Sequence, residues 1–275
     1  MTTFFAKFLA DQTGIPVSEI EVIQGDSDRI AKGGGTGGSR SVTTQANATL
    51  ATVDKMVAAF TPFLAEEMGV DEEAVEFDGE TFRAPGSNLT PTVLETADLA
   101  REKGRVDLLR HQAEASLPGR SFPNGAHLAE VVIDRDTGQS RVDRYTVVDD
   151  FGNLINPMLA EGQVHGGVAQ GLGQAMLEHV VYDAEGQLLT ATFMDYAMPR
   201  AEDMPWVGFT SEPVPSTQNP MGMKGCGEAG TVGALAAVAN AVQDALWDQG
   251  IRQVDMPFTP VKLWELITDV SQAAE

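Results

Sequence analysis

Glu228 is the residue whose type and surroundings most strongly suggest catalysis. It lies in the stretch Lys224–Thr231, where glycines on both sides would let a ligand approach its carboxylate. The stretch leads into the clearest helical pattern of the chain, and a helix N-terminus keeps a carboxylate ionised, as a general base requires. Acidic residues are also ordinary in first helical turns, which explains most such positions without catalysis. Cys226 has no histidine near it in sequence, so we interpret it as a small buried hydrophobic residue rather than a nucleophile.

The glycine run Gly33–Ser41 is the second candidate. It precedes a long amphipathic pattern, so its backbone amides would lie at a helix start, where phosphate groups bind. The P-loop pattern is not met, because Ser39 and Arg40 stand where that motif has a lysine and a hydroxyl residue. The glycine pattern of dinucleotide-binding proteins lacks its strand-and-acid context. A flexible loop explains the run alone equally well.

Five glycines fall within a helical pattern between Gly162 and Gln174. Each costs about 1 kcal/mol of helix stability relative to alanine. Such a pattern indicates close packing against the backbone, either by another helix or by a ligand. His165 lies in this stretch, but none of the four histidines belongs to the His-Glu-x-x-His pattern of a zinc site. We therefore predict no metal site made of protein side chains and interpret His165 as an ordinary histidine.

These candidates lie between alternating helices and hairpins. Apolar residues recur at helical spacing in six segments, and strand-like alternation around turn pairs such as Asp78-Gly79 predicts hairpins. The predicted helices are Thr2–Asp11, Val42–Glu67, Pro91–Lys103, Glu161–Glu178, Gly230–Trp247 and Pro260–Val270. The predicted strands and hairpins are Ile20–Ile23, Val75–Phe82, His127–Asp149, Val180–Thr192 and Trp206–Pro213. Because helices alternate with hairpins, we expect an α+β fold with helices packed on mixed or antiparallel sheets.

The composition narrows the classes of function. The chain has 275 residues, 40 acidic and 18 basic, with a formal net charge of -22. This charge argues against nucleic-acid binding and against docking on anionic membranes, and no apolar run approaches a membrane span. A single cysteine excludes a disulfide framework and a Cys-ligated iron–sulfur cluster within this chain. The apolar start is interrupted by Lys7 and lacks a cleavage pattern, so we expect no signal peptide and a cytoplasmic location.

Taken in order, these segments resemble the molybdenum hydroxylases, the family of xanthine dehydrogenase, aldehyde oxidoreductase and the large subunit of aerobic carbon monoxide dehydrogenase. The similar stretches are Gly33–Ser41, His127–Asp149, Asp149–Gln174, Tyr196–Arg200 and Lys224–Gly233. Each motif is weak alone, and the ordered set is strong. The resemblance covers nearly the whole chain and implies the C-terminal portion of the molybdopterin-binding domain of a large subunit.

The resemblance also implies a role for individual residues. Glu228 matches the catalytic glutamate, a general base in oxidative hydroxylation with water as the oxygen source. Gln170 matches a glutamine that contacts the molybdenum cofactor, and Lys224 matches a further cofactor-binding position. The pterin and its phosphate would contact a loop of five residues: Gly37, Gly38, Ser39, Arg40 and Ser41. The implied cofactor is molybdopterin in its cytosine dinucleotide form, with molybdenum held by the pterin dithiolene rather than by side chains.

Family large subunits are far longer than this chain and carry upstream cofactor loops that this sequence lacks. The resemblance therefore implies partners: the missing N-terminal half of the large subunit, and further subunits that hold the iron–sulfur clusters and FAD. Residues 1–275 would form one portion of the domain, with two subdomains of about 1–125 and 126–275.

The main hypothesis is a C-terminal piece of a molybdenum-dependent oxidoreductase that is active only with partner chains. The alternative is a non-catalytic truncated fragment or assembly module that keeps the fold without cofactor. Such a fragment would self-associate through its exposed apolar surface. A third hypothesis is a protein that binds a phosphate ligand through Gly33–Ser41. The substrate stays open among N-heterocycles, aldehydes and carbon monoxide.

Overall fold

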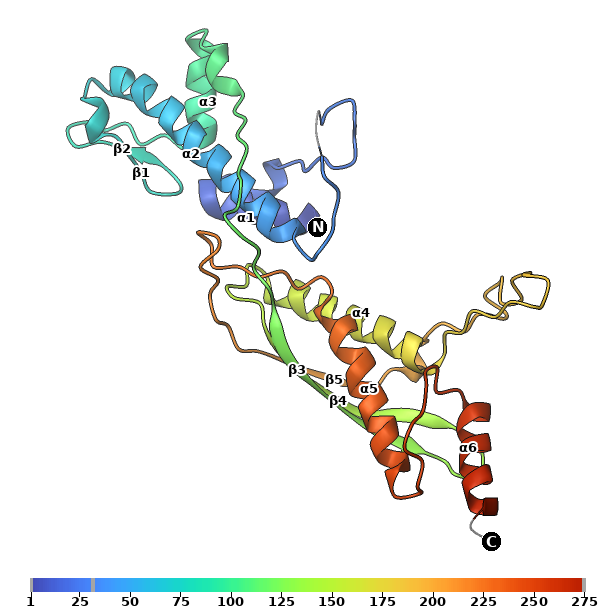
Figure 1. Ribbon diagram of the computed structural model, residues 1–275. Helices are drawn as coiled ribbons and strands as arrows, with labels where there is room; N and C mark the ends of the chain where they lie inside the picture. Colours follow the sequence, from blue (N-terminus) through green and yellow to red (C-terminus); the bar gives the residue numbers. More distant parts are fainter. Residues whose placement is uncertain (1, 31–32, 274–275) are drawn as a thin grey trace. The chain divides into compact units, whose positions relative to one another are not determined.

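The computed structural model describes residues 2–30 and 33–273 (Figure 1). The chain divides into two compact units. The first comprises Met1–Arg120 with Thr217–Met221, and the second comprises Ser121–Ser216 with Gly222–Glu275. Each unit contains its own cluster of buried apolar side chains.

The first unit is built around a long helix, α2 (Ser41–Met68), which ends at Gly69 with φ 68. Glycine suits this end because it adopts the left-handed conformation without a steric penalty. The other elements of this unit are α1 (Thr2–Thr13), η1 (Val17–Glu19), η2 (Glu72–Ala74), β1 (Glu76–Phe77), β2 (Phe82–Arg83), α3 (Val93–Glu102) and η3 (Val106–Leu109). Apolar side chains of α2, β2 and α3 form its core: Phe60, Phe63, Leu64, Phe82 and Val93.

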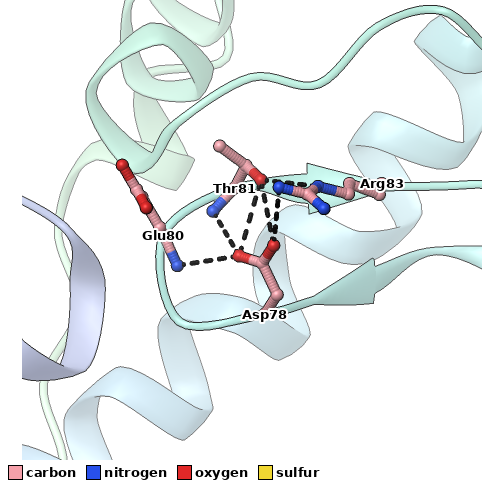
Figure 2. Close-up of polar contacts among 4 residues, drawn as sticks. All are labelled: Asp78, Glu80, Thr81 and Arg83. Carbon is pink, nitrogen blue, oxygen red and sulfur yellow. Dashed lines mark hydrogen bonds and ion pairs between the residues drawn. The ribbon is translucent and has the colours of Figure 1, made fainter.

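The turn between β1 and β2 is organised by the carboxylate of Asp78. Its Oδ1 accepts hydrogen bonds from the N–H groups of Glu80 at 3.0 Å and Thr81 at 2.8 Å (Figure 2). Its Oδ2 lies 2.9 Å from Arg83 Nη2. The backbone bonds are the main cause of a pKa of Asp78 below its ordinary value. Gly79 completes the turn with φ 96, so the predicted hairpin at this pair is confirmed.

The second unit packs helices on a three-stranded mixed sheet. Strands β3 (Asn124–Ile133) and β4 (Ser140–Asp150) pair antiparallel, and β5 (Val207–Ser211) pairs parallel with β4. The helices of this unit are α4 (Pro157–Met176), η4 (Ala201–Asp203), α5 (Ala229–Trp247) and α6 (Pro260–Ala273). Helix α5 contacts both β3 and α4, so α5 packs on the sheet and α4 packs mainly on α5 (Figure 1).

The core of the second unit lies between this sheet and its helices. Its buried side chains include Tyr145, Val147, Val164, Val168, Leu172, Val238, Val242, Leu246 and Leu263. Burying one such apolar side chain contributes about 1.5–3 kcal/mol to folding. Helices on a small mixed sheet, together with a hairpin, confirm the predicted α+β class.

Helix α4 begins four residues before the predicted start. Asn156 caps it, because its side-chain oxygen accepts a hydrogen bond from the Leu159 N–H at 3.2 Å, and Pro157 occupies the first turn. Both residue types are favoured at these positions. The apolar periodicity was therefore a poorer guide to this boundary than the capping residues.

One predicted strand is wrong. Ile20–Ile23 forms no strand and pairs with none of the strands in the described residues. β-forming residues are present there, but no neighbouring strand supplies a ladder of hydrogen bonds. The predicted hairpin Val180–Thr192 does turn back at residues 184–186, with an antiparallel bridge between Tyr182 and Leu188 and a hydrogen bond from the Leu189 N–H to the Val181 carbonyl, but its pairing is too short to form two strands.

Within the described residues, no helix combines the length and the apolar character needed to cross a membrane.

Candidate functional site

The glycines of α4 form a close contact with α5. A Cβ built on Gly167 would lie 2.9 Å from Gly230 Cα, and one built on Gly171 would lie 2.6 Å from Ala234 Cβ. A Cβ on Gly230 would in turn lie 2.4 Å from the Val164 carbonyl oxygen. We call this contact the glycine seam. It answers the question left by the sequence, because it is a helix that packs against the backbone at Gly167, Gly171 and Gly230.

The glycine seam holds the turn that carries Glu228. Gln163, one helical turn before Gly167 on α4, donates a hydrogen bond from Nε2 to the Gly227 carbonyl at 2.8 Å. Glu228 occupies the N-cap position of α5 with an exposed side chain that makes no capping bond. Its backbone carbonyl accepts the first helical bond, from the Val232 N–H at 3.0 Å. The backbone on both sides of Glu228 is therefore fixed, while the residue itself is exposed.

Gln163 is not among the site residues predicted from the sequence. The signal that could have found it is spacing, because positions 163, 167, 170 and 171 share one face of a helix.

Gln170 is anchored at the same seam. Thr231 Oγ1 lies 3.0 Å from the Gly167 carbonyl oxygen and 3.1 Å from Gln170 Oε1, and the Gln170 side chain is exposed. Thr231 is three residues after Glu228, in the first turn of α5. The seam therefore brings the amide of Gln170 to the helix end that carries Glu228.

Lys224 forms an ion pair with Asp150 at the end of β4, and their side chains are only 10% and 14% exposed. Asp150 Oδ1 also accepts hydrogen bonds from the N–H groups of Gly152 at 2.8 Å and Val214 at 2.9 Å. Burial alone would raise the pKa of Asp150, but the hydrogen bonds from Lys224 and these two N–H groups outweigh it, so its pKa lies below the ordinary value. The ammonium of Lys224 therefore ties the loop before Glu228 to the sheet.

A buried polar group lies beneath the start of α5. His127 Nδ1 lies 2.8 Å from the Tyr145 hydroxyl, and its Nε2 lies 3.4 Å from Asp149 Oδ1. Burial, followed by the charge of Asp149, raises the pKa of Tyr145 well above its usual range. A Cβ built on Gly233 would lie 2.4 Å from His127 Nδ1, so the imidazole packs directly against the second turn of α5. This group was not predicted from the sequence, because its members meet only through the pairing of β3 with β4.

Cys226 and His165 are not arranged as catalytic groups. Burial raises the pKa of the Cys226 thiol, which disfavours the thiolate. His165 Nε2 lies 3.9 Å from Glu161 Oε1, four residues earlier on the same helix. Within the described residues, no group of three His, Cys, Asp or Glu side chains could hold a metal ion.

The glycine loop belongs to the first unit and leads into α2, as predicted. Gly38 and Ser39 are consecutive left-handed residues, with φ 62 and φ 56. Such a conformation costs a non-glycine residue about 1–3 kcal/mol and is typical of ligand sites. Arg40 Nε donates to the Gly37 carbonyl at 3.0 Å, and Ser41 Oγ lies 2.8 Å from Thr36 Oγ1.

The sequence-predicted site residues thus fall into two groups. Glu228, Gln170 and Lys224 lie in the second unit, around the glycine seam. The five loop residues from Gly37 to Ser41 lie in the first unit.

Comparison with known proteins identifies the family. The model of the molybdopterin cofactor-binding domain matches residues 1–205. The chain belongs to this family. The carbon monoxide dehydrogenase large chain of Hydrogenophaga pseudoflava is 33% identical over 279 residues, covering 97% of this chain and 34% of that relative. Subunit gamma of the 6-hydroxypseudooxynicotine dehydrogenase complex of Paenarthrobacter nicotinovorans is 30% identical over 277 residues, covering 98% of this chain and 35% of that relative.

A solved structure agrees with this assignment. A crystal structure of Cu,Mo-CO dehydrogenase matches with a TM-score of 0.89 at 32% identity, over 98% of this chain and 34% of that chain. The resemblance to the molybdenum hydroxylases is therefore confirmed, and the family model corresponds to part of their large subunit. This member of the molybdopterin cofactor-binding domain family spans about a third of the length of the relatives it matches.

Proposed function

We propose that this chain supplies the catalytic glutamate and part of the molybdenum-cofactor cage of a molybdenum-dependent hydroxylase. The observation that carries the proposal is the position of Glu228, exposed at the N-terminus of α5 on a turn held to α4 by Gln163. A general base needs a carboxylate that reaches the reacting atoms while its backbone stays fixed.

The residues present fit a pterin cofactor that carries a phosphate. Gly37 has nothing within 4 Å of the place where its Cβ would be, so a ligand could approach the backbone there. Arg40 adds a guanidinium beside that loop, a group that pairs well with phosphate. Gln170 offers an exposed amide at the edge of the glycine seam. When bound, the cofactor would supply the metal and the redox chemistry of hydroxylation.

The proposal gives each residue a distinct task. Glu228 accepts the proton released as oxygen from water is transferred to the substrate. Gln170 orients the cofactor through its amide, while the N–H groups from Gly37 to Ser41 bind its phosphate. Lys224 belongs to the cofactor cage through its loop, because its ammonium is paired with Asp150.

The proposal extends to partners and cofactor form. The remaining part of a large subunit would complete the cage, and iron–sulfur and flavin subunits would carry the electrons away. The name of one relative, a complex subunit gamma, and the short share of each relative that is matched support this assembly. The cofactor would be the cytosine dinucleotide form, in a cytoplasmic enzyme, with the substrate open among N-heterocycles, aldehydes and carbon monoxide.

Substitution of Glu228 tests the proposal. In the assembled enzyme, Glu228→Gln should lower kcat by at least about 100-fold, the usual contribution of a general base, while molybdenum and pterin content stay unchanged. Glu161→Gln removes another exposed carboxylate, on α4, and should leave kcat unchanged. Turnover preserved in Glu228→Gln would exclude the base role.

The alternative is a non-catalytic fragment or assembly module, which the many exposed apolar side chains favour. It predicts a chain that self-associates on size exclusion and shows no pterin absorbance, even when it is produced with the remaining part of a large subunit. The third hypothesis, phosphate-ligand binding by Gly33–Ser41, predicts nucleotide affinity in the isolated chain.

A further inference from the structure

The segment 177–206, between α4 and β5, has the composition of an interface. None of its residues is buried, although all of them are described. Its exposed apolar side chains are Val180, Tyr182, Leu189, Phe193, Met194, Met198 and Trp206, and those of Phe193, Met194 and Trp206 are 84%, 93% and 87% exposed. Aromatic residues and methionine are the types enriched at the centres of protein–protein interfaces. We call this segment the arm.

The arm contacts the rest of the second unit near its two ends and otherwise contacts itself. Leu177 and Met204 pack against the core of this unit, and a Cβ on Gly173 of α4 would lie 2.7 Å from Pro199 Cγ. Within the arm, Tyr196 donates a hydrogen bond to Glu178 Oε2 at 2.6 Å. Further along, the backbone bonds join arm residues to one another, such as Leu189 N–H to the Val181 carbonyl at 2.8 Å. In Figure 1 it is the yellow-to-gold loop that runs on beyond the end of α4. A segment that is anchored near both ends and exposes apolar side chains between them is arranged as a docking segment rather than as a disordered one.

The exposed surface of the whole chain is large enough for a stable interface. The chain exposes 16641 Å² at a mass of 29.3 kDa. Two compact units of half that mass, held fully apart, would expose about 14,000 Å². The excess of roughly 2,600 Å² on this one chain is more than the about 800 Å² that each partner buries in a standard protein–protein interface.

The comparisons narrow the possible occupant. The Cu,Mo-CO dehydrogenase structure matches 98% of this chain, so nearly all of the arm has a counterpart in a chain about three times as long. The arm also carries six acidic residues and one arginine: Glu178, Asp183, Glu185, Asp195, Glu202, Asp203 and Arg200. Two identical acidic arms repel each other, whereas an apolar groove edged by basic residues complements both features.

We infer that the arm docks in an apolar, basic-edged groove on the part of the large subunit that lies outside this chain's match to its relatives. Phe193 and Met194 are the apolar anchors, and the acidic residues form the rim. This inference rests on the proposed function, because it assumes that the chain works as one portion of a larger subunit.

The test measures binding to a defined polypeptide. The probe is the unmatched part of the Hydrogenophaga pseudoflava carbon monoxide dehydrogenase large chain, produced together with this chain as a separate polypeptide. The wild-type chain should co-purify with it, and Phe193→Ser with Met194→Ser should raise the Kd at least tenfold. The matched control is Val106→Ser with Val261→Ser, which removes one exposed valine from each unit and should leave the Kd unchanged.

Each outcome decides between the claims. Equal binding by the wild type and the arm variant overturns the docking inference and leaves the proposed function standing. A wild-type chain that does not co-purify counts against the proposed function and the inference together. A wild-type dimer that the arm variant converts to a monomer assigns the arm to a second copy and overturns the inference. Circular dichroism should show the same helix content in all variants, since none of the four side chains is buried.

Discussion

Glycine serves opposite purposes in the seam and in the loop before α2. In the glycine seam, a side chain on Gly167 or Gly230 would overlap backbone atoms of the other helix. In the loop, Gly33, Gly34 and Gly37 have nothing within 4 Å and no left-handed conformation to maintain. The seam glycines are thus explained by the protein itself, whereas those loop glycines are not. This difference separates a packing role from a binding role for the same residue type.

The largest effect on stability is expected when a methyl group is added inside the glycine seam. Gly167→Ala should lower the free energy of unfolding by about 3 kcal/mol, because the methyl group would meet the backbone of Gly230 and Thr231 rather than a side chain that can turn away. Gly166→Ala is the matched control on the same helix. Its Cβ meets nothing within 4 Å, so this variant should be more stable by about 1 kcal/mol. Urea denaturation measures both, and equal midpoints would mean that the seam is not tightly packed.

A smaller effect is expected where the neighbouring loop is tied to the sheet. Lys224→Met should lower the free energy of unfolding by about 2 kcal/mol, since the largely buried Asp150 carboxylate would lose its charged donor. Arg144→Met is the control, because its pair with Glu130 is 70% and 52% exposed and such pairs contribute at most about 1 kcal/mol. A Lys224 variant no less stable than the Arg144 variant would contradict the assigned role.

The same pair predicts a pH dependence. The pKa of Asp150 is lower in the folded chain, so its contribution is complete above the unfolded value of about 4 and is lost as pH falls through the folded pKa. The stability difference between the wild type and Lys224→Met should therefore be full at pH 6 and shrink on acidification to pH 3. A stability difference that does not change with pH would mean that the Asp150 carboxylate does not cause it.

The smallest structural effect is expected in the loop. Gly37→Ala should change the free energy of unfolding by less than about 0.5 kcal/mol, because its Cβ meets no protein atom. In the assembled enzyme it should nevertheless lower the molybdenum and pterin content per protein, since the methyl group would occupy the ligand's space. Gly34→Ala, in equally open space outside the five predicted residues, should keep the cofactor. Full cofactor content in Gly37→Ala would mean that Gly37 does not contact the ligand and belongs to a flexible loop.

Local sequence patterns predicted those elements whose pairing segments are adjacent in the sequence. The Asp78-Gly79 turn and the hairpin from His127 to Asp149 pair strands that are adjacent in sequence, and α5 follows from apolar spacing and matches its prediction within one residue. Ile20–Ile23 shows the limit, because strand-forming residues become a strand only when another strand accepts their hydrogen bonds. The spacing of residues in the sequence does not indicate whether such a partner strand is present.

The sequence predicted which residues belong to the candidate site, but it did not predict which of them contact one another. Glu228 and the glycine loop were predicted at helix starts, and they lie there. The pairing of Lys224 with Asp150 and of Gln163 with the Gly227 carbonyl was not predicted, because each joins residues more than sixty positions apart. The roles of the site residues in cofactor binding and catalysis stay predictions.

The hydrogen bond from Gln163 to Gly227 spans 64 residues, and the arm lies within the loop that this bond closes. The entropy of closing a loop grows only with the logarithm of its length, so doubling the loop costs about 0.6 kcal/mol. Insertions or deletions in the arm would therefore disturb the Glu228 turn very little. The docking surface that we infer can therefore change in length and sequence while the geometry around the glutamate is kept, so the two can evolve independently.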